Sequence, residues 1–545
     1  MTGGAPLSAL PDDRTATLDG LERGLFDLVL IGGGITGAGI ARDAALRGLS
    51  VALLEASDFA AGTSSRSSKL IHGGLRYLAM GDVALVRETA LERTRVYRLA
   101  PHLAEPRWML LPTRSLASAM KFRVAVTAYE KLGAVTGADI HRNLAGEDLA
   151  REEPLLRRDR YSHAVAYREY LTDDARLVLA NLRCAAEHGA VALNHAAVHE
   201  ITMDAGRVDG VVARDARTGR EFRVRACCVV NAAGPWVEGV RGLVQTGGDP
   251  WLHLSKGVHI GIPLERLPVE NMVVMNADDR RTLFVIPRDG VVYVGTTDTT
   301  HSAGPAVWPE IEKADVDYLL APLSQYFDTA PIGRDDVVTA WAGLRPLVAQ
   351  AGKKAVDISR KDEIHIGAGG LVSIAGGKLT GYRKMAVNIM KTVEAALGRT
   401  LPEADPDLAL PGGDFSGDFE TLADSIAVRS GLDERTARRL VRLYGAEAED
   451  VLALDSSKFS GDDRVVGGEI DWGVTRELAV TLEDMIYRRL RVALYEPGTA
   501  ERIAVPVAER MGALLGWDDD ERSNQVRSVR ARLASDLTFV GEGER

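Results

Sequence analysis

The sequence predicts an α/β fold followed by an all-helical C-terminal domain. Three observations support this fold class: a strand–turn–helix–strand pattern at residues 26–56, short β segments from about residue 190 onward, and mainly helical patterns after residue 405. Strands that alternate with helices favour a mostly parallel sheet with helices packed on its faces. The 545 residues are enough for two or three domains with a large core.

The first βαβ unit has the clearest pattern in the chain. Residues 27–31 form an apolar run typical of a buried strand, and glycines follow at once. Apolar residues then recur at helical spacing, Gly48 ends the helix, and a second apolar run at 51–54 closes with Glu55. We therefore expect a strand, a tight turn, a helix and a second strand in this order.

The remaining elements follow from the same periodicities. Helical spacing predicts helices at 82–100, 118–134, 172–190 and 477–495. The third of these is expected to be capped by Thr172 or Asp173. Two β runs within 282–297, joined by an Asp-Gly pair, predict a hairpin. Residues 371–390 repeat the order of strand, Gly-Gly and helix.

Composition shifts divide the chain into three predicted regions. Residues 1–24 lack both a targeting pattern and a clear periodicity, and are expected to be a disordered extension. Residues 25–405 hold the mixed α/β patterns, and a Pro/Gly/Asp-rich stretch ends them. Residues 406–545 are expected to form the helical domain, with the arginines near 488–491 on a solvated face.

Charge and cysteine content limit the function classes. A formal net charge of -11 argues against general nucleic-acid binding. The three cysteines (Cys184, Cys227 and Cys228) form neither a disulfide framework nor a metal motif, which suits a reducing, cytoplasmic compartment. No apolar run is long enough to span a bilayer. Residues 118–134 mix apolar and basic side chains, so they are either an interfacial helix or an ordinary surface helix.

A glycine-rich turn follows the first strand. Gly32, Gly34 and Gly37 form GxGxxG, which allows a tight turn, close approach of a pyrophosphate and close packing of helix on sheet. The helix N-terminus adds free N–H groups for the phosphates. Glu55, about 20 residues further on, stands where a carboxylate binds a ribose hydroxyl. These features predict a site for FAD or NAD rather than NADP.

The order of later motifs favours FAD. A nicotinamide enzyme normally continues with further βα units, whereas this chain returns to the site much later, with NAAGPW at 231–236 and the turn at Gly376 and Gly377. A flavin site assembled from distant segments explains this order. No residue stands out as a point of covalent attachment, so the flavin is expected to be non-covalent.

Several blocks together resemble one family. GGGITGAGIARDAALRGLSVALLEASDFAAGTSSRSSKLIHGGLRYL, TDDARLVLAN, VVNAAGPWV, SKGVHI, FVIPRDG, VGTTD, GLRPL and AGGKLTGYRK are similar, in this order, to the FAD-dependent glycerol-3-phosphate dehydrogenases. The resemblance covers about residues 25–400 and implies a glutathione-reductase-like FAD-binding Rossmann domain. A β-rich substrate lobe would be interleaved with it, and a helical C-terminal domain would follow. Gly381 departs from the pattern, since a hydroxyl residue is expected there.

The resemblance also implies which residues bind the cofactor. Beyond Gly32, Gly34, Gly37 and Glu55, it assigns to the FAD site Thr63, Ser64, Ser65, Ser67, Ser68, Lys69, Leu70, His72, Gly73, Gly74, Gly234, Asp298, Gly377, Lys378 and Leu379. Asp298 is expected either to contact the flavin or to order the site.

The substrate phosphate requires donors of fixed geometry, which arginine supplies with its planar fork. The resemblance implies that the phosphate and substrate contacts come from Arg76, Tyr77, Arg360, Lys378 and Thr380. Each of the three basic residues also has an interpretation without a role in substrate binding. Arg76 could form a surface salt bridge, and Arg360 and Lys378 could be solvated.

Two residues are implied in catalysis. His259, in SKGVHI, matches the family's active-site histidine, and its pKa range suits removal of a proton from the C2 hydroxyl. The alternative is a satisfied core histidine on a strand. Arg345, in GLRPL, would hold the substrate oxygen or tune the flavin.

The sequence therefore predicts oxidation of sn-glycerol 3-phosphate to dihydroxyacetone phosphate, with hydride passing from C2 to flavin N5. The family implies a membrane quinone as electron acceptor and peripheral attachment to the inner face of the membrane. Formation of a homodimer is left open by the sequence. Three alternatives remain: a glycerol-3-phosphate oxidase that uses oxygen, an amine or amino-acid oxidase on the same fold, and a non-enzymatic flavin-binding redox sensor.

Overall fold

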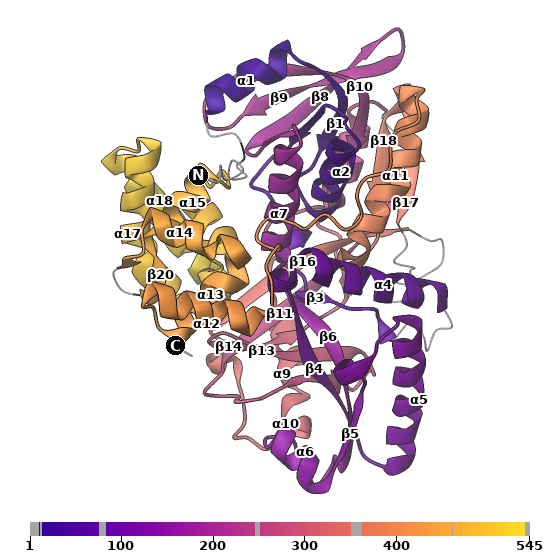
Figure 1. The fold of residues 1–545 in the computed structure, drawn as a ribbon, viewed down its shortest axis with the longest axis vertical. Helices are drawn as coiled ribbons and strands as arrows, with labels where there is room; N and C mark the ends of the chain where they lie inside the picture. Colours follow the sequence, from indigo (N-terminus) through magenta and orange to yellow (C-terminus); the bar gives the residue numbers. More distant parts are fainter. Residues whose placement is uncertain are drawn as a thin grey trace.

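Two large β-sheets and a C-terminal helical region make up the protein (Figure 1). The computed structural model describes residues 10, 13–75, 83–245, 251–349, 362–459 and 462–539. Within these residues no helix is both long and apolar enough to cross a membrane. The predicted fold class is confirmed, because segments of the two sheets alternate along the chain and the last region is helical.

The first sheet is the nucleotide-binding sheet. Its strands run in the order β17-β18-β10-β1-β2-β7, and β9 and β8 extend it from β10. The strands are β1 (Leu25–Ile31), β2 (Val51–Leu54), β7 (Val191–Leu193), β8 (Ala196–Asp204), β9 (Arg207–Asp215), β10 (Glu221–Asn231), β17 (Glu363–Ile366) and β18 (Val372–Ala375). The central strands β18, β10, β1, β2 and β7 pair in parallel, so their carboxyl ends meet at one edge.

Helices cover one face of this sheet. They are α2 (Ile35–Leu46), α7 (Asp174–Glu187) and α11 (Tyr382–Leu397), and their apolar residues share a core with Leu28, Leu30 and Leu53. The side chains of Val29 and Leu54 point to the opposite face, where β8, β9 and α1 (Arg14–Arg23) cover them. This alternation explains why the first two strands are apolar throughout. Asp173, not Thr172, caps α7.

The second sheet is the one that we call the substrate lobe, after the role predicted for it. Its strands run in the order β15-β11-β14-β13-β12-β4-β6-β3, with β16 beside β11 and β5 beside β6. The strands are β3 (Leu70–Ile71), β4 (Ala104–Thr113), β5 (Arg142–Ala145), β6 (His163–Thr172), β11 (Leu252–Pro263), β12 (Met272–Asn276), β13 (Thr282–Arg288), β14 (Val291–Gly295), β15 (Thr299–Thr300) and β16 (Thr339–Val348). The hairpin predicted within 282–297 is β13–β14.

Among the described residues, six further α-helices lie around the two sheets. They are α4 (Val83–Leu99), α5 (Leu116–Leu132), α6 (Gly146–Glu152), α8 (Val237–Gly242), α9 (Lys313–Leu320) and α10 (Leu323–Tyr326). Of these, α5 lies on the outside of the substrate lobe (Figure 1). It packs against α4, β4 and β6.

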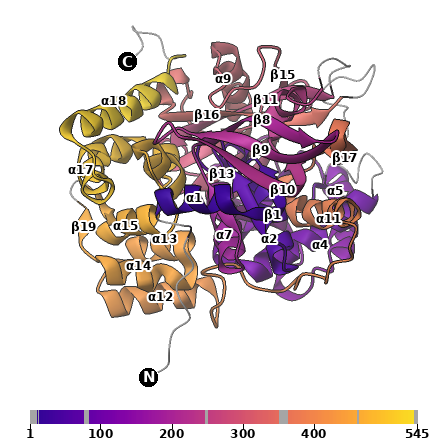
Figure 2. The ribbon, with the colours of Figure 1, turned by 90° about the horizontal axis from the view of Figure 1, so that it is seen from above.

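The C-terminal region stands beside the nucleotide-binding sheet and the substrate lobe (Figure 2). It contains α12 (Phe419–Ser430), α13 (Glu434–Tyr444), α14 (Ala448–Leu454), α15 (Gly467–Thr475), a π-helix (Asp484–Arg489), α16 (Val492–Tyr495), α17 (Pro497–Leu515), α18 (Asp519–Ser535) and the short pair β19 (Lys458–Phe459) and β20 (Asp462–Val466). Apolar residues of the π-helix, α16 and α17 share one core cluster with the substrate lobe.

The predicted disorder of residues 1–24 is wrong for α1. This helix begins after the Asp13 cap and buries Leu18 and Leu21 against the nucleotide-binding sheet. Arg14 donates hydrogen bonds to Asp215 and to the carbonyl of Asn194. This helix could not be predicted from the sequence pattern, because only one narrow side of it is apolar. The residue with which Arg14 forms its ion pair lies about 200 residues away in sequence.

The solvated face predicted for the tail arginines is also wrong. Arg488, Arg489 and Arg491 are buried, and each forms ion pairs with buried carboxylates. The predicted helix is interrupted as well, because Arg491 adopts a left-handed conformation (φ 64) between the π-helix and α16. These three arginines, close together in sequence, therefore form ion pairs inside the protein.

Candidate active site

A large cavity is lined by residues from both sheets. Its volume is about 1100 Å³, above the range of about 300–1,000 Å³ usual for sites that hold one drug-sized ligand. Its lining includes the carboxyl ends of β1, β2 and β18 on one side, and His259 and Arg345 of the substrate lobe on the other. There is room for a dinucleotide together with a small substrate.

The β1–α2 turn forms one end of the cavity. Gly32 has a φ of 113, which favours glycine, and a Cβ at Gly37 would collide with the Gly32 carbonyl. The first N–H group of α2, from Ile35, donates to Ser64 Oγ at 2.9 Å. The three predicted glycines thus bring backbone close to the cavity and to the N-terminus of α2.

Glu55 directly follows β2 and lines the cavity. Its carboxylate accepts hydrogen bonds from the N–H groups of Gly33 (2.6 Å) and Ser57 (2.8 Å), which fix its orientation. Burial raises the pKa of Glu55, and both N–H groups oppose this rise. A carboxylate has about four acceptor positions, so this one can still accept ribose hydroxyls.

The segment that follows contributes most of the other predicted cofactor residues. Those that line the cavity are Thr63, Ser64, Ser67, Ser68, Leu70, His72 and Gly74. Ser65, Lys69 and Gly73 do not line it. Lys69 Nζ instead donates to the Ser65 carbonyl and to Asp174, and the Gly73 N–H donates to Tyr129 Oη at 2.9 Å.

The β18–α11 connection reaches the cavity next to His72. Gly376 and Gly377 both have positive φ, and Gly377, Lys378, Leu379 and Thr380 line the cavity together with Gly234. Thr380 Oγ1 accepts from the His72 N–H and donates to the His72 carbonyl, both at 3.1 Å. Its hydroxyl therefore joins two cavity segments, which differs from the predicted substrate contact. Lys378 Nζ is buried beside them.

His259 lies on β11 between β14 and β16. Its partners in register are Gly295 and Trp341. The imidazole stacks on Trp341, with ring centroids 5.2 Å apart and planes at 12°. A Cβ at Gly295 would collide with the imidazole, so that glycine makes room for it. His259 Nε2 lies 2.9 Å from Ser68 Oγ, whereas Nδ1 has no hydrogen-bond partner among the described residues.

The surroundings of His259 favour the neutral imidazole. Burial holds its pKa well below the usual range, and the positive charges of Lys69 and Arg345 lower it further. When Nδ1 carries the ring proton, the Nε2 lone pair faces the Ser68 hydroxyl, which lines the cavity. A neutral histidine with an available lone pair can accept a proton. A pKa well below the usual range differs from the near-neutral pKa expected for His259 and makes the imidazole a weaker base, because burial and two nearby cations disfavour the protonated ring.

Arg345 lies on β16 opposite Ser255 of β11. Its guanidinium donates to Thr296 Oγ1 (2.9 Å) and to the Thr297 carbonyl (3.2 Å), and it pairs with Asp298 (3.5 Å). A Cβ at Gly257 would occupy the guanidinium's position. Asp298 pairs with Arg345 and both residues line the cavity, so the two roles predicted for Asp298, contact with the flavin and ordering of the site, stay predictions.

The residues that hold the His259 and Arg345 side chains were not predicted from the sequence. Gly257, Gly295 and Thr296 lie within the SKGVHI and VGTTD motifs, and Trp341 lies two residues before GLRPL, but their contacts cross between strands. A glycine two residues before His259 and another before the Thr-Thr pair were the available signals. Three predicted substrate residues, Arg76, Tyr77 and Arg360, lie outside the described residues.

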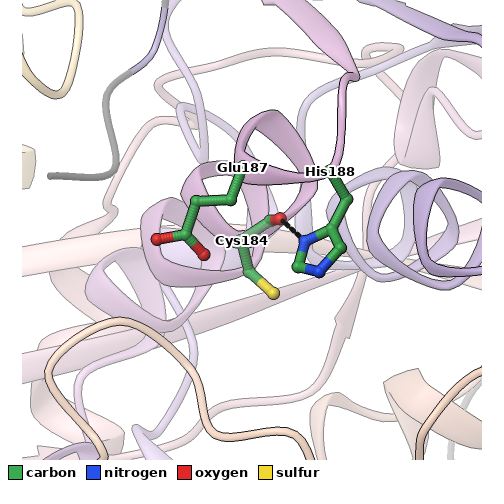
Figure 3. A group of neighbouring side chains, drawn as sticks. All are labelled: Cys184, Glu187 and His188. Atoms are coloured by element: carbon green, nitrogen blue, oxygen red, sulfur yellow. Dashed lines mark hydrogen bonds between the residues drawn. The ribbon is translucent and has the colours of Figure 1, made fainter. Parts of the chain in front are cut away.

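Two groups of possible metal ligands occur among the described residues, away from the cavity. Cys184, Glu187 and His188 share one side of α7, where the His188 ring faces the Cys184 carbonyl (Figure 3). Burial raises the pKa of the Cys184 thiol, which disfavours the thiolate that a metal needs. In the other group, Asp58 and Asp484 are both paired with arginine. Neither arrangement favours a cation.

The residues that line the cavity fit FAD. The glycine turn after β1 and the N-terminus of α2 supply the N–H donors that a pyrophosphate needs. Glu55 supplies the acceptor that a ribose needs. The second glycine turn, at Gly376 and Gly377, lets backbone pass close to a flat ring. The cavity then continues to His259 and Arg345, so a flavin and a small substrate fit end to end.

Comparisons with known proteins agree with this geometry. A family model described as FAD dependent oxidoreductase matches residues 27–383, and one described as the C-terminal domain of alpha-glycerophosphate oxidase matches residues 406–522. The aerobic glycerol-3-phosphate dehydrogenase of Staphylococcus epidermidis is 38% identical over 525 residues, covering 93% of this chain and 94% of the relative. That of Staphylococcus aureus is 39% identical over 481 residues, covering 85% and 86%.

Solved structures show the same relationship. The glycerol-3-phosphate dehydrogenase from Bacillus halodurans complexed with FAD is 33% identical, covers 97% of this chain and 99% of its own, and has a TM-score of 0.81. L-alpha-glycerophosphate oxidase from Mycoplasma pneumoniae, at 17% identity and a TM-score of 0.53, shows the shared fold over 71% of this chain and 98% of its own. With its fold, its cavity and these relatives, the chain belongs to the FAD-dependent oxidoreductases and, among them, to the aerobic glycerol-3-phosphate dehydrogenase family.

Proposed function

We propose that this protein oxidises sn-glycerol 3-phosphate to dihydroxyacetone phosphate and passes the electrons to a membrane quinone. One observation supports the reaction most strongly. A neutral, buried histidine, an arginine and a lysine line the same cavity as the glycine-rich nucleotide turn. Relatives that match nearly the whole chain carry the name of this activity.

His259 is the proposed base. Its neutral imidazole accepts the proton of the substrate C2 hydroxyl at Nε2, where Ser68 Oγ now lies at 2.9 Å. Trp341 and the space left by Gly295 hold the ring in position. FAD, when bound, supplies the acceptor for the hydride that leaves C2. Arg345 stabilises the negative charge that develops on the substrate oxygen, and Asp298 fixes its guanidinium.

Lys378 is the proposed phosphate ligand among the described residues. It follows the Gly376-Gly377 turn and lines the cavity, and its buried ammonium is a compact charge suited to a phosphate dianion. Arg76, Tyr77 and Arg360 stay predictions as further ligands. Thr380 contributes indirectly, because it holds the His72 backbone beside Lys378.

The quinone proposal rests on α5. Leu116, Met120 and Val124 expose their apolar side chains on this helix. Phe122, Val124 and Ala125 also line the cavity, so an apolar surface leads from the outside of the protein to the active site. Lys121, on the same helix, suits contact with anionic headgroups. We therefore propose that α5 attaches the protein to the cytoplasmic face of the membrane, where a quinone can reach the cavity.

An anaerobic titration tests the reaction itself. The purified holoprotein is titrated with sn-glycerol 3-phosphate while the absorbance of the oxidised flavin is followed. Stoichiometric bleaching is expected, and unphosphorylated glycerol should leave the spectrum unchanged because Lys378 then has no phosphate to bind. A flavin that stays oxidised with the phosphate ester contradicts the proposal, and amino acids would then be tested as substrates.

A charge on α5 tests the route for the acceptor. Val124→Glu places a carboxylate on a side chain that is 71% exposed and also lines the cavity. We expect anaerobic bleaching to stay normal, while reoxidation by a lipid-soluble quinone and binding to anionic vesicles both fall. Val428→Glu, at a position 84% exposed on α12, is the matched control and should change neither. Equal behaviour of the two variants contradicts the assignment of α5.

Oxygen is the second candidate acceptor, because the family model that matches the C-terminal region is described as that of alpha-glycerophosphate oxidase. The reduced protein is mixed with air or with a quinone, and reoxidation rates and hydrogen peroxide are measured. Fast reoxidation by the quinone with little peroxide supports the dehydrogenase. Fast, stoichiometric peroxide formation supports the oxidase instead.

A further inference from the structure

Lys69 is a buried lysine that the mechanism above does not use. Its side chain is fully buried, and its backbone has a φ of 55, an uncommon conformation for a residue with a Cβ. Lys69 Nζ donates to the Ser65 carbonyl at 2.8 Å and to Asp174 at 3.2 Å. It does not line the cavity, although the residues on either side of it in sequence do.

Keeping an ammonium in this position is costly. Burial lowers the pKa of Lys69 to about 7, even though Asp174 opposes the shift. Asp174 is shared, because it also accepts from Ser67 Oγ (2.7 Å) and from the Arg491 guanidinium (2.7 Å). Arg491 belongs to the C-terminal region and also pairs with Asp173. An apolar residue would avoid this cost, so the retained charge needs an explanation.

The Lys69 ammonium and His259, the proposed base, both lie against the ring of Trp341. Lys69 Nζ is 4.9 Å from the centroid of the Trp341 ring, and the same ring stacks on His259 at 5.2 Å. Ser68, the preceding residue, contacts His259 Nε2. The 67–69 segment therefore places a hydroxyl on the imidazole and an ammonium on the tryptophan that supports it.

We propose that Lys69 is a positioning residue for the reaction: its bonds to Ser65 and Asp174 hold Ser68 against the imidazole, and its buried positive charge lies against the tryptophan on which His259 stacks. Lys69 then acts on the base and not on FAD. Arg491 takes part by orienting Asp174, so the C-terminal region contributes to the active site. The catalytic consequence rests on the proposed function, whereas the effect on His259 does not need substrate.

The charges around both groups determine the direction of the effect. His259 is faced by Lys69 and Arg345, and by the aromatic side chains of Tyr293 and Trp341. Lys69 is faced by Asp173, Asp174 and Arg491. His259 titrates well below its usual range, where Lys69 is protonated. Removing the Lys69 charge must therefore raise the pKa of His259.

The first test is the titration of His259 in the full-length holoprotein without substrate. Protein with isotope-labelled histidine is titrated by NMR, and the His259→Asn variant assigns the signal. In Lys69→Met the pKa of His259 should rise by about one unit, the scale of a nearby unit charge at an effective dielectric constant of about 20. Lys69→Arg keeps the charge and should leave the His259 pKa close to that of the unaltered protein.

The second test is the pH dependence of flavin reduction. If neutral His259 is the base, the acidic limb of the rate profile shifts to higher pH in Lys69→Met and is restored in Lys69→Arg. Lys256→Met is the matched control, because Lys256 is a similarly buried lysine on the same strand as His259 and pairs with Asp315 (2.7 Å). Lys256→Met should change neither the pKa of His259 measured by NMR nor the acidic limb of the pH–rate profile.

The outcomes separate the alternatives. An unchanged pKa of His259 in Lys69→Met overturns the proposal, and so does an equal rise in Met and Arg, which would indicate altered packing. Lys69→Gln retains a donor for the Ser65 carbonyl and replaces Met where that variant does not fold. A shifted NMR titration in a protein that does not reduce its flavin would support the role of Lys69 and refute the proposed function.

Discussion

The two sides of the cavity are built in different ways. On the nucleotide side, Gly32, Gly37 and Glu55 come from one βαβ unit, and most of what they present is backbone. On the substrate side, His259 and Arg345 come from strands more than 80 residues apart, and side chains do the chemistry. The nucleotide side depends on local sequence order, whereas the substrate side depends on which residues face each other across strands.

Glycine shows the difference most clearly. Gly37 lets a helix approach its own preceding turn, five residues away in sequence. Gly295 and Gly257 instead leave space for the His259 and Arg345 side chains of neighbouring strands. The first use belongs to a known local motif. The second becomes visible only when the register of the substrate lobe is known. Substitutions on the two sides should therefore fail in different ways.

The largest effect is expected on the nucleotide side. Gly37→Val directs a branched side chain into the Gly32 carbonyl, so the turn cannot keep its shape. We expect loss of bound flavin and destabilisation at or above the upper end of the about 1–3 kcal/mol typical of overpacking. Flavin absorbance and thermal unfolding measure both. Gly20→Ala, where a Cβ meets nothing within 4 Å, is the control and should keep its flavin.

Arg345→Lys should keep the flavin and lose the chemistry. Lysine cannot donate to Thr296, Thr297 and Asp298 and also present a planar fork to the substrate. The rate of anaerobic flavin reduction is expected to fall about 10²–10³-fold, as for loss of a donor to a developing oxyanion. Stopped-flow absorbance measures this rate. A variant with normal reduction would show that Arg345 does not contact the reacting oxygen.

Gly295→Ala should displace His259 without removing it. The added methyl group occupies space that the imidazole needs, so the ring must move off Trp341. A shift of about 1 Å can cost about 10²-fold in rate, and flavin content should stay normal. Loss of flavin in this variant would contradict the separation of the two sides. Gly242→Ala, on α8 with nothing within 4 Å of the added Cβ and outside the cavity lining, is the matched control for reduction.

Thr380→Val tests the junction between the two sides and should have the smallest effect. Valine matches the shape but leaves the partly buried His72 N–H without its Thr380 acceptor, which costs up to about 1–3 kcal/mol. We expect a lower melting temperature and a reduction rate within about tenfold of the unaltered protein. Thr475→Val, at a solvent-exposed hydroxyl on α15, is the control. A complete loss of reduction would mean that Thr380 contacts the substrate directly.

The sequence alone predicted much of the nucleotide side. The GxGxxG turn, Glu55 and the second glycine turn at 376–377 all lie where local patterns place them. His259 and Arg345 were identified through the family resemblance, not through periodicity. Trp341, which supports His259, and Asp174, which pairs with Lys69, were missed because strand register and ion pairing join residues that are distant in sequence.

Charge burial was the property hardest to predict. Lys69 looked like one more cofactor contact in a polar loop, and the tail arginines looked solvated, yet all of them are buried and paired. Composition shows a charge but not its partner. The helix α1 illustrates the same limit, because its ion pair from Arg14 to Asp215 spans two hundred residues.

The contact of Arg488 and Arg489 with Asp58 has a consequence for synthesis on the ribosome. Asp58 lies near the start of the chain and is fully buried, yet its arginine partners are among the last sixty residues. Until they emerge, the nascent nucleotide domain carries a carboxylate that its interior cannot bury without a counter-charge. The domain that begins the chain therefore completes its folding only near the end of translation, and C-terminal truncations should yield aggregation-prone polypeptides.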